Sequence, residues 1–448
     1  MQKNNYYLTY VIVGTMLFGM FFGAGNLIFP IQLGQLAGNH FWLALIGFLT
    51  TAIGLPLIGI IAIGLSGSNG LKDIASRVHP IFGISFSICL YLIIGPLFAL
   101  PRTATVPFAV GIQPYVSQSM QTPMLAIFSF VFFAAVYYFS RNPAKAMDYI
   151  GKYLTPIFLF FLFLLIIISF IKPMGTFNNA QSTYVTQPFT TGFKEGYNTM
   201  DALASLAFGI IVINAIKQRG ITDAKKIADV TWKSGLFAMG LMTVIYGCIA
   251  YMGGTSVNQV GLLENGGLIF GAVSHHYFGT FGGLLLALII VLACIKTSIG
   301  LVTSCSTFFN EVFPKVSYKT FVFIMSFISF IIANVGLTNI VKLAVPVLMI
   351  VYPIAIVLIL LTLFADLFKS NSAVYFSTVA LTLIISLIDG YNALITMMPG
   401  TQNVVFDGIA KFYSNILPFY DLGLGWLVPA AIGTLIGLVF YRFKYKVS

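Results

Sequence analysis

The chain has 448 residues, of which 58% are hydrophobic and 8% are charged, whereas soluble proteins carry about 25% charged residues. This composition excludes a soluble globular protein, and no polar stretch is long enough to form a separate catalytic domain. The formal net charge of +11 does not indicate nucleic-acid binding, because the basic residues are spread over short loops and form no single stripe. Membrane lipid is therefore the expected surrounding, and no obligate protein partner is implied.

Apolar stretches of about 20 residues recur along the chain, and each is long enough to cross a hydrocarbon core of about 30 Å as a helix. The run 157–170 is apolar on every face and is too long for the alternating strands of a membrane barrel. The sequence therefore predicts an all-α membrane protein with about twelve transmembrane helices. The expected spans are 8–36, 41–65, 80–112, 123–140, 150–172, 190–217, 232–254, 279–307, 319–339, 342–364, 373–395 and 421–441.

The loops between these spans alternate in their content of lysine and arginine. With the N-terminus inside, most lysines and arginines fall in cytoplasmic loops and very few in the facing loops, as the positive-inside rule predicts. We therefore expect a multi-pass protein of the bacterial cytoplasmic (inner) membrane with both termini in the cytoplasm. The longest external connections are expected at 173–191 and 255–278, the second as a partly folded loop. The four cysteines lie inside apolar spans, so we expect neither disulfides nor a metal site, and no cofactor.

Two spans contain small and polar residues at membrane depth. The first has three glycines and an asparagine within 19–26, where each glycine disfavours a continuous helix by up to about 1 kcal/mol. The sixth has a similar stretch at 195–205. Unwound segments expose N–H groups at one half-helix end and carbonyls at the other, which can hold a carboxylate and a cation. The alternative is that these small residues only permit close helix packing, but paired breaks favour a binding site.

The two breaks are five spans apart. An odd number of crossings inverts the second copy of a repeat in the membrane, so this spacing fits two inverted repeats of five helices. We expect the first repeat at 1–172 and the second at 173–364. Two peripheral C-terminal helices then occupy 365–448.

Several segments together resemble one family. They are GAGNLIFP at 23–30, GPLFALPRTATV at 95–106, EGYNTMDALASLAFGIIVINA at 195–215, ACIKTSIGLVTS at 293–304 and VPVLMIVYP at 345–353. The chain resembles, over essentially its whole length, the bacterial branched-chain amino acid carriers, the leucine-isoleucine-valine:cation symporters. The resemblance implies the five-plus-five inverted-repeat fold of the bacterial leucine transporter. It also implies a secondary active transporter that imports leucine, isoleucine and valine by cation-coupled symport.

The resemblance places the substrate between the two breaks. Backbone amides of the first break would meet its carboxylate, carbonyls and one hydroxyl would meet its α-amino group, and an aromatic ring would cover its aliphatic side chain. The amides belong to Ala24, Gly25 and Asn26, the carbonyls to Phe21 and Ala202, the hydroxyl to Ser205 and the ring to Phe208. A hydrophobic pocket separates isoleucine from valine by only about 1–3 kcal/mol, so overlapping substrates are expected.

The resemblance also places a sodium site between the first break and the eighth span. Its positions correspond to Gly19, Phe22, Ala293, Lys296 and Thr297, so a lysine stands where a hydroxyl is expected. That lysine lies roughly 15 Å from the cytoplasmic end of its span, too far to reach water easily. Because burial disfavours a charged ammonium, it could replace sodium and couple transport to protons. The alternative is a static lysine that faces an aqueous cavity or pairs with a carboxylate such as Asp201.

The coupling ion is therefore H⁺ or Na⁺, with the proton slightly favoured. A second sodium site of the fold needs a hydroxyl where this chain has Leu203.

Arg102, at an expected helix distortion, either gates the pathway or satisfies freed carbonyls, and the second role is favoured. Asp201 either orients the second break or joins a proton relay, or it caps the half-helix that follows it, and capping is favoured.

Other classes of protein fit the sequence less well. No catalytic motif, paired carboxylates or nucleotide-binding loop occurs, so an enzyme or a primary pump is not expected. A channel agrees with the composition, but paired helix breaks favour alternating access. A related permease for other amino acids or for nucleobases is the remaining alternative.

Overall fold

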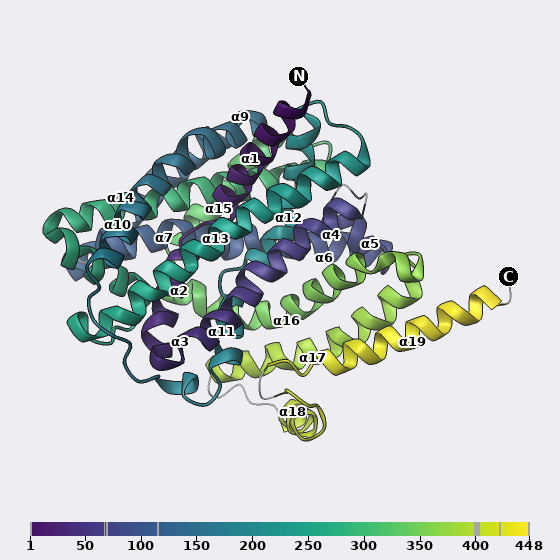
Figure 1. The fold of residues 1–448 in the computed structure, drawn as a ribbon. Helices are drawn as coiled ribbons and strands as arrows, with labels where there is room; N and C mark the ends of the chain where they lie inside the picture. The colour runs from purple at the N-terminus through teal and green to yellow at the C-terminus, as the bar shows by residue number, and fades with distance from the viewer. Residues whose placement is uncertain are drawn as a thin grey trace.

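The computed structural model describes residues 2–66, 68, 70–113, 116–397, 404–420 and 423–446, and this part of the chain contains helices and no strands (Figure 1). The α-helices of the first third are α1 (Gln2–Phe21), α2 (Gly25–Ala37), α3 (Phe41–Leu49), α4 (Leu55–Leu65), α5 (Leu71–Ser76), α6 (Pro80–Leu92), α7 (Ala99–Gly111), α8 (Gln121–Ser140) and α9 (Pro143–Asp148). The others are α10 (Thr155–Ile171), α11 (Pro188–Tyr197), α12 (Asp201–Lys217), α13 (Ala224–Val260), α14 (Gly266–Val312), α15 (Tyr318–Ala333), α16 (Leu337–Leu363), α17 (Ser372–Met397), α18 (Val404–Ile416) and α19 (Leu427–Lys446).

Most of these helices are long and apolar enough to lie in a membrane. Among the described residues, eight helical stretches could each cross a bilayer, and the bent pair α11 and α12 makes a ninth. Three shorter apolar helices add to these: Tyr7–Phe21, Tyr318–Ala333 and Leu427–Phe443. The structure thus confirms a multi-pass helical protein. The count of twelve spans and the two inverted repeats stay predictions.

Both interruptions expected from the sequence are present. The first separates α1, which ends at Phe21, from α2, which begins at Gly25. The second separates α11 from α12, and the two helices are bent by 40°. Met200, in this second break, has the left-handed backbone angles φ 61° and ψ 11°. Such a conformation in a non-glycine residue is uncommon, costs about 1–3 kcal/mol and is enriched at functional sites.

Two local expectations differ from the structure. The helix distortion expected near Arg102 lies instead at Gly95, where ψ is −125°. Pro101 lies in the first turn of α7, where its missing N–H group needs no intrahelical partner. The connection 255–278 is mostly helical, because α13 continues to Val260 and α14 begins at Gly266, with a kink at Gly279 (φ 57°).

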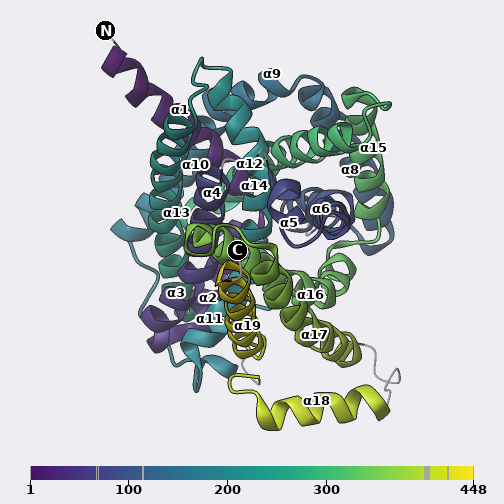
Figure 2. The ribbon, with the colours of Figure 1, turned by 90° about the vertical axis from the view of Figure 1, so that its right-hand side faces the viewer.

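The two broken helices lie inside the bundle. α12 packs against α4 and α14, α2 packs against α13, and α7 packs against α14. α17 and α19 pack on each other at one edge of the bundle, beside α16 (Figures 1 and 2). α18 runs crosswise to these two helices (Figure 2). The breaks are therefore surrounded by protein, so that their freed backbone groups must find partners within the bundle.

Candidate functional site

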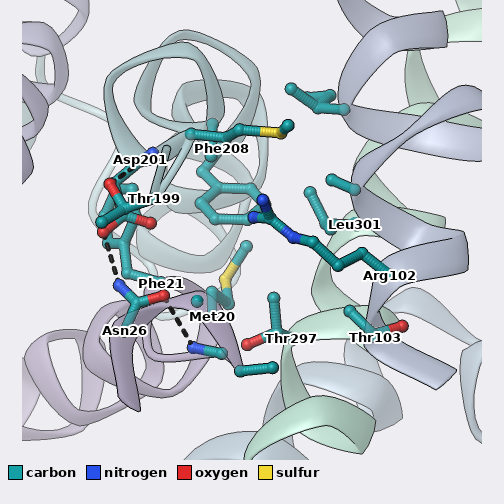
Figure 3. Close-up of a pocket in the computed structure, with 17 residues that line it drawn as sticks. Met20, Phe21, Asn26, Arg102, Thr103, Thr199, Asp201, Phe208, Thr297 and Leu301 are labelled. Carbon is teal, nitrogen blue, oxygen red and sulfur yellow. Dashed lines mark hydrogen bonds between the residues drawn. The ribbon is translucent and has the colours of Figure 1, made fainter. Parts of the chain in front are cut away.

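A cavity of about 30 Å³ lies between the two breaks, with α7 and α14 on its other side (Figure 3). This volume holds about two water molecules, so an amino acid can enter only after the helices or side chains around the cavity move. Five residues expected at the substrate line the cavity: Phe21, Ala24, Gly25, Asn26 and Phe208. The rings of Phe21 and Phe208 meet edge to face, with centroids 5.2 Å apart.

Ala202 and Ser205 do not line this cavity, which corrects their expected place. The Ser205 hydroxyl donates a hydrogen bond to the Ala202 carbonyl at 2.7 Å, and the side chain lies against Gly59 of α4. The α12 residues that reach the cavity are Asp201, Ala204 and Phe208, which follow one another in steps of three and four residues and so share one helix face. The face of α12 that lines the cavity therefore differs from the face that carries Ser205.

A buried hydrogen-bond network joins the two breaks. The Asn26 side-chain amide donates to Asp201 Oδ2 at 2.6 Å and also to the Tyr246 hydroxyl, while its Oδ1 accepts from the Gly23 N–H at 3.3 Å. The Tyr246 hydroxyl in turn donates to Asp201 Oδ2 at 3.1 Å. The network fixes α2 and α12 to α13. Sequence reasoning missed Tyr246, because nothing in its surroundings distinguishes it from other tyrosines in apolar spans.

The favoured role of Asp201, as a helix cap, is wrong. Its carboxylate accepts hydrogen bonds from α2 and α13, and no side-chain cap bond occurs at the start of α12. The hydroxyl of Thr199 accepts from the Asp201 N–H at 3.4 Å instead. The alternative role, in which Asp201 orients the second break, stays a prediction.

Lys296 lies fully buried against the first break. Its ammonium donates to the Phe22 carbonyl at 2.6 Å and to the Gly19 carbonyl at 3.4 Å. It also lies 4.2 Å from the ring centroid of Phe158 and 5.3 Å from those of Phe18 and Phe22, where cation–π attraction stabilises a positive charge.

Neither static alternative for Lys296 matches this arrangement. Ion pairs in the described part of the chain join Lys72 to Glu311, Lys152 to Asp148 and Lys233 to Asp229, so Lys296 has no carboxylate partner there. Asp201 binds elsewhere, and Lys296 does not line the central cavity.

The same carbonyls were expected to bind sodium. With the ammonium in contact with both of them, a sodium ion fits only if Lys296 first moves away. Ala293, whose carbonyl was expected there, is buried. The Thr297 hydroxyl is buried without a hydrogen-bond partner and lines the cavity beside Gly23. It is therefore available to a ligand of the cavity.

Arg102 reaches into the cavity from α7 (Figure 3). Its Nη1 donates to the Asn198 carbonyl of the second break at 3.0 Å, and its guanidinium lies 5.8 Å from the ring centroid of Phe29. Arg102 thus satisfies a freed carbonyl, although that carbonyl belongs to another helix. Arg102 and Met200 also line a second, smaller cavity, whose remaining wall includes the start of α16. These two side chains therefore lie between the cavities.

The fold agrees with comparisons to known proteins. Among solved structures, the chain resembles the transporter Mhp1 of the nucleobase-cation-symport-1 family, in a closed conformation with bromovinylhydantoin bound. The TM-score is 0.60 at 11% sequence identity, and the match covers 98% of this chain and 93% of Mhp1. This likeness shows a shared transporter fold.

The sequence relatives identify the family of the chain, which the structural match alone does not. The chain is 45% identical over 438 residues to the branched-chain amino acid permease BrnQ of Bacillus subtilis, covering 98% of each chain. It is 38% identical over 434 residues to the branched-chain amino acid transport system 2 carrier protein of Pseudomonas aeruginosa, covering 97% of this chain and 96% of that one. These relatives are permeases and carriers, not enzymes. The family model described as branched-chain amino acid transport protein matches residues 7–444, and the chain therefore belongs to this family.

Proposed function

We propose that this protein imports leucine, isoleucine and valine across the bacterial cytoplasmic membrane by proton-coupled symport. The family membership and the transporter fold support the substrate class and the transport reaction. The central cavity supports the place of binding, because apolar side chains surround a few polar groups, as is usual in small-molecule sites. In the proposed topology, twelve spans form two inverted repeats with peripheral C-terminal helices, and both termini lie in the cytoplasm.

The proposed walls of the site come from both breaks. Phe21 and Phe208 would contact the aliphatic side chain, and the N–H groups at the start of α2 would meet the carboxylate. These first N–H groups of a helix have no intrahelical acceptor, and the helix dipole favours a negative charge there. A pocket made of apolar side chains discriminates weakly between aliphatic groups, which supports shared transport of the three substrates.

The observation that carries the proton coupling is the pair of hydrogen bonds from Lys296 to the carbonyls of Gly19 and Phe22. In the proposed cycle, the protonated ammonium holds the end of α1 against α14. Loss of the proton removes the charge that strengthens these hydrogen bonds and allows α1 to move. The ammonium would therefore perform the task that a sodium ion performs in a sodium-coupled carrier.

The test is uptake of radiolabelled leucine into proteoliposomes, with pH and sodium gradients imposed separately. Unlabelled isoleucine, valine, alanine and uracil serve as competitors. Saturable uptake that a pH gradient drives without sodium, and that isoleucine and valine inhibit, would support the proposal. Strict sodium dependence would support an amino acid carrier but refute proton coupling. Absence of leucine uptake under both gradients, or inhibition by uracil instead, would overturn the substrate assignment.

Two substitutions test Lys296 itself. Lys296→Arg keeps a positive charge but cannot release it at any accessible pH, so we expect normal insertion and loss of pH-driven uptake. Lys296→Met removes the charge and should also abolish the response to the pH gradient. Lys145→Met, in an exposed segment, is the matched control. A pH gradient that still accelerates uptake by both Lys296 variants would refute the proposed role.

A further inference from the structure

We propose that Arg102 and Asp201 are the two charged ligands of the transported amino acid, Arg102 for its carboxylate and Asp201 for its ammonium group. This inference rests on the proposed function, because it assumes that an amino acid occupies the central cavity. It goes beyond the site implied by the family resemblance, in which main-chain groups and the Ser205 hydroxyl bind both charged ends.

The first observation is the charge distribution in the cavity. Among the described residues that line it, Arg102 is the only cation and Asp201 the only anion. They approach from opposite sides, Asp201 from the second break and Arg102 from α7 (Figure 3). No ion pair within 4.0 Å joins them in the described part of the chain, in contrast to the three surface pairs. A zwitterion carries one charge of each sign and can bridge such a separated pair.

The second observation concerns the surroundings of the guanidinium. Nη1 of Arg102 donates to the Asn198 carbonyl, whereas Nη2 has no acceptor among the described residues and lies 3.3 Å from the position a Cβ would take on Gly25. Gly25 is the first residue of α2. The free guanidinium nitrogen and the N–H groups at the start of α2 therefore face the same small volume. A carboxylate there would accept from both, and arginine offers it two parallel donors.

The third observation concerns Asp201. The hydrogen bonds from Asn26 and Tyr246 both end on Oδ2, and an ionised carboxylate can accept about four hydrogen bonds through its two oxygens. Oδ1 therefore keeps capacity for the ammonium of a ligand. The Thr297 hydroxyl adds a polar group that is 9% exposed and has no partner. It lines the same cavity and can donate to the carboxylate or accept from the ammonium.

The small volume of the cavity has a consequence for Arg102. The guanidinium fills part of the space that the ligand needs, so it must retreat when the amino acid enters. The second cavity adjoins Arg102 and Met200 and is lined by apolar residues of α16, among them Ala344 and Leu348. Asn198 lines the second cavity as well, so a shift in that direction lets Nη1 keep the Asn198 carbonyl while Nη2 meets the ligand carboxylate. Arg102 then both binds the ligand and closes the site toward α16.

The test compares three ligands on the purified full-length protein by ligand-induced thermal stabilisation. Leucine has both charges, leucinamide lacks the carboxylate, and 4-methylpentanoate lacks the ammonium. We expect the unmodified protein to bind leucine about 10- to 100-fold more tightly than either analogue, as loss of one charged hydrogen-bonding group implies. Arg102→Gln should lose leucine affinity by a similar factor and retain its affinity for leucinamide. Asp201→Asn should weaken leucine and leucinamide and retain the affinity for 4-methylpentanoate.

The controls separate binding from folding and from the proposed function. Arg141→Gln and Asp148→Asn make the same chemical changes at exposed positions and should alter no affinity. If Arg102→Gln or Asp201→Asn does not fold, Arg102→Lys and Asp201→Glu take their place, and the same selective losses decide: Arg102→Lys should weaken leucine and not leucinamide, and Asp201→Glu should weaken leucine and leucinamide and not 4-methylpentanoate. Equal affinity for leucine and both analogues, or an equal loss of all ligands in the variants, would overturn the inference. Absence of leucine binding by the unmodified protein would instead refute the proposed function.

Discussion

Removal of one hydroxyl tests whether the network between the breaks positions them for binding. Tyr246→Phe deletes the group that donates to Asp201 and accepts from Asn26. The ring itself should stay in place, because it packs against Phe22 and Phe48 with centroids 5.7 and 5.6 Å away. The substitution therefore changes hydrogen bonding with little change in packing.

The size of the expected effect of Tyr246→Phe follows from the hydrogen-bond partners that remain. Asn26 still donates to Asp201 at 2.6 Å, so neither group loses every partner when the hydroxyl is removed. The main loss is the hydrogen bond from Tyr246 to the carboxylate, and a bond to a charged group contributes about 1.5–3 kcal/mol. If this bond orients α12 for the ligand, the same free energy appears as a roughly 10- to 100-fold loss of leucine affinity.

The assay is leucine affinity of the purified protein together with its melting temperature, and Tyr138→Phe on the exposed face of α8 is the control. We expect Tyr246→Phe to lower both quantities and the control to change neither. A lower melting temperature with unchanged affinity would assign the network to folding alone. Unchanged affinity and unchanged melting temperature together would refute the reasoning.

Three further substitutions follow from the same contacts. Ser205→Ala should leave leucine affinity unchanged in a binding titration and lower stability by only about 0.5–1.5 kcal/mol, because its hydroxyl bonds within α12 and not to the cavity. Gly23→Val should abolish leucine uptake while surface expression persists, because even a Cβ there would lie 3.1 Å from the Thr297 hydroxyl, and Gly240→Val, in open space, should not. Met200→Val should lower the melting temperature more than Met200→Asn, because β-branched residues rarely adopt positive φ and asparagine does so more readily. Equal melting temperatures of these two variants would show that the left-handed conformation at this position is not maintained.

The membrane architecture and the two breaks could be predicted because they depend on local sequence. Long apolar stretches indicate spans by composition alone, and glycine and polar residues at membrane depth mark the positions where helices stop. The contact of Lys296 with the first break could also be anticipated, since a buried ammonium requires oxygen partners and the resemblance offered two carbonyls. These signals need no knowledge of how distant helices turn toward one another.

The orientation of side chains on α12 could not be predicted in the same way. Its buried residues run from Asp201 to Ile216 with few exceptions, so no polar stripe distinguishes the face toward the cavity from the face toward α4. The choice of Ser205 over Ala204 therefore had no support in periodicity. The capping role of Asp201 was wrong because its actual partners come from α2 and α13, more than 40 residues away in either direction along the chain.

The three buried charges have a common feature that bears on how the carrier opens. Lys296 and Arg102 each bind a backbone carbonyl freed by a break, and Asp201 accepts from the side chain of Asn26 in the other break. An unpaired charge in an apolar interior is strongly unfavourable, so none of these contacts can open until another partner replaces it. Water could serve only if the cavity opened to solvent, whereas a bound amino acid supplies partners for Arg102 and Asp201 inside the bundle, and release of the Lys296 proton removes the charge that needs a partner. Opening of the closed bundle should therefore require substrate binding and proton release together, which is the condition for coupled transport with little leak.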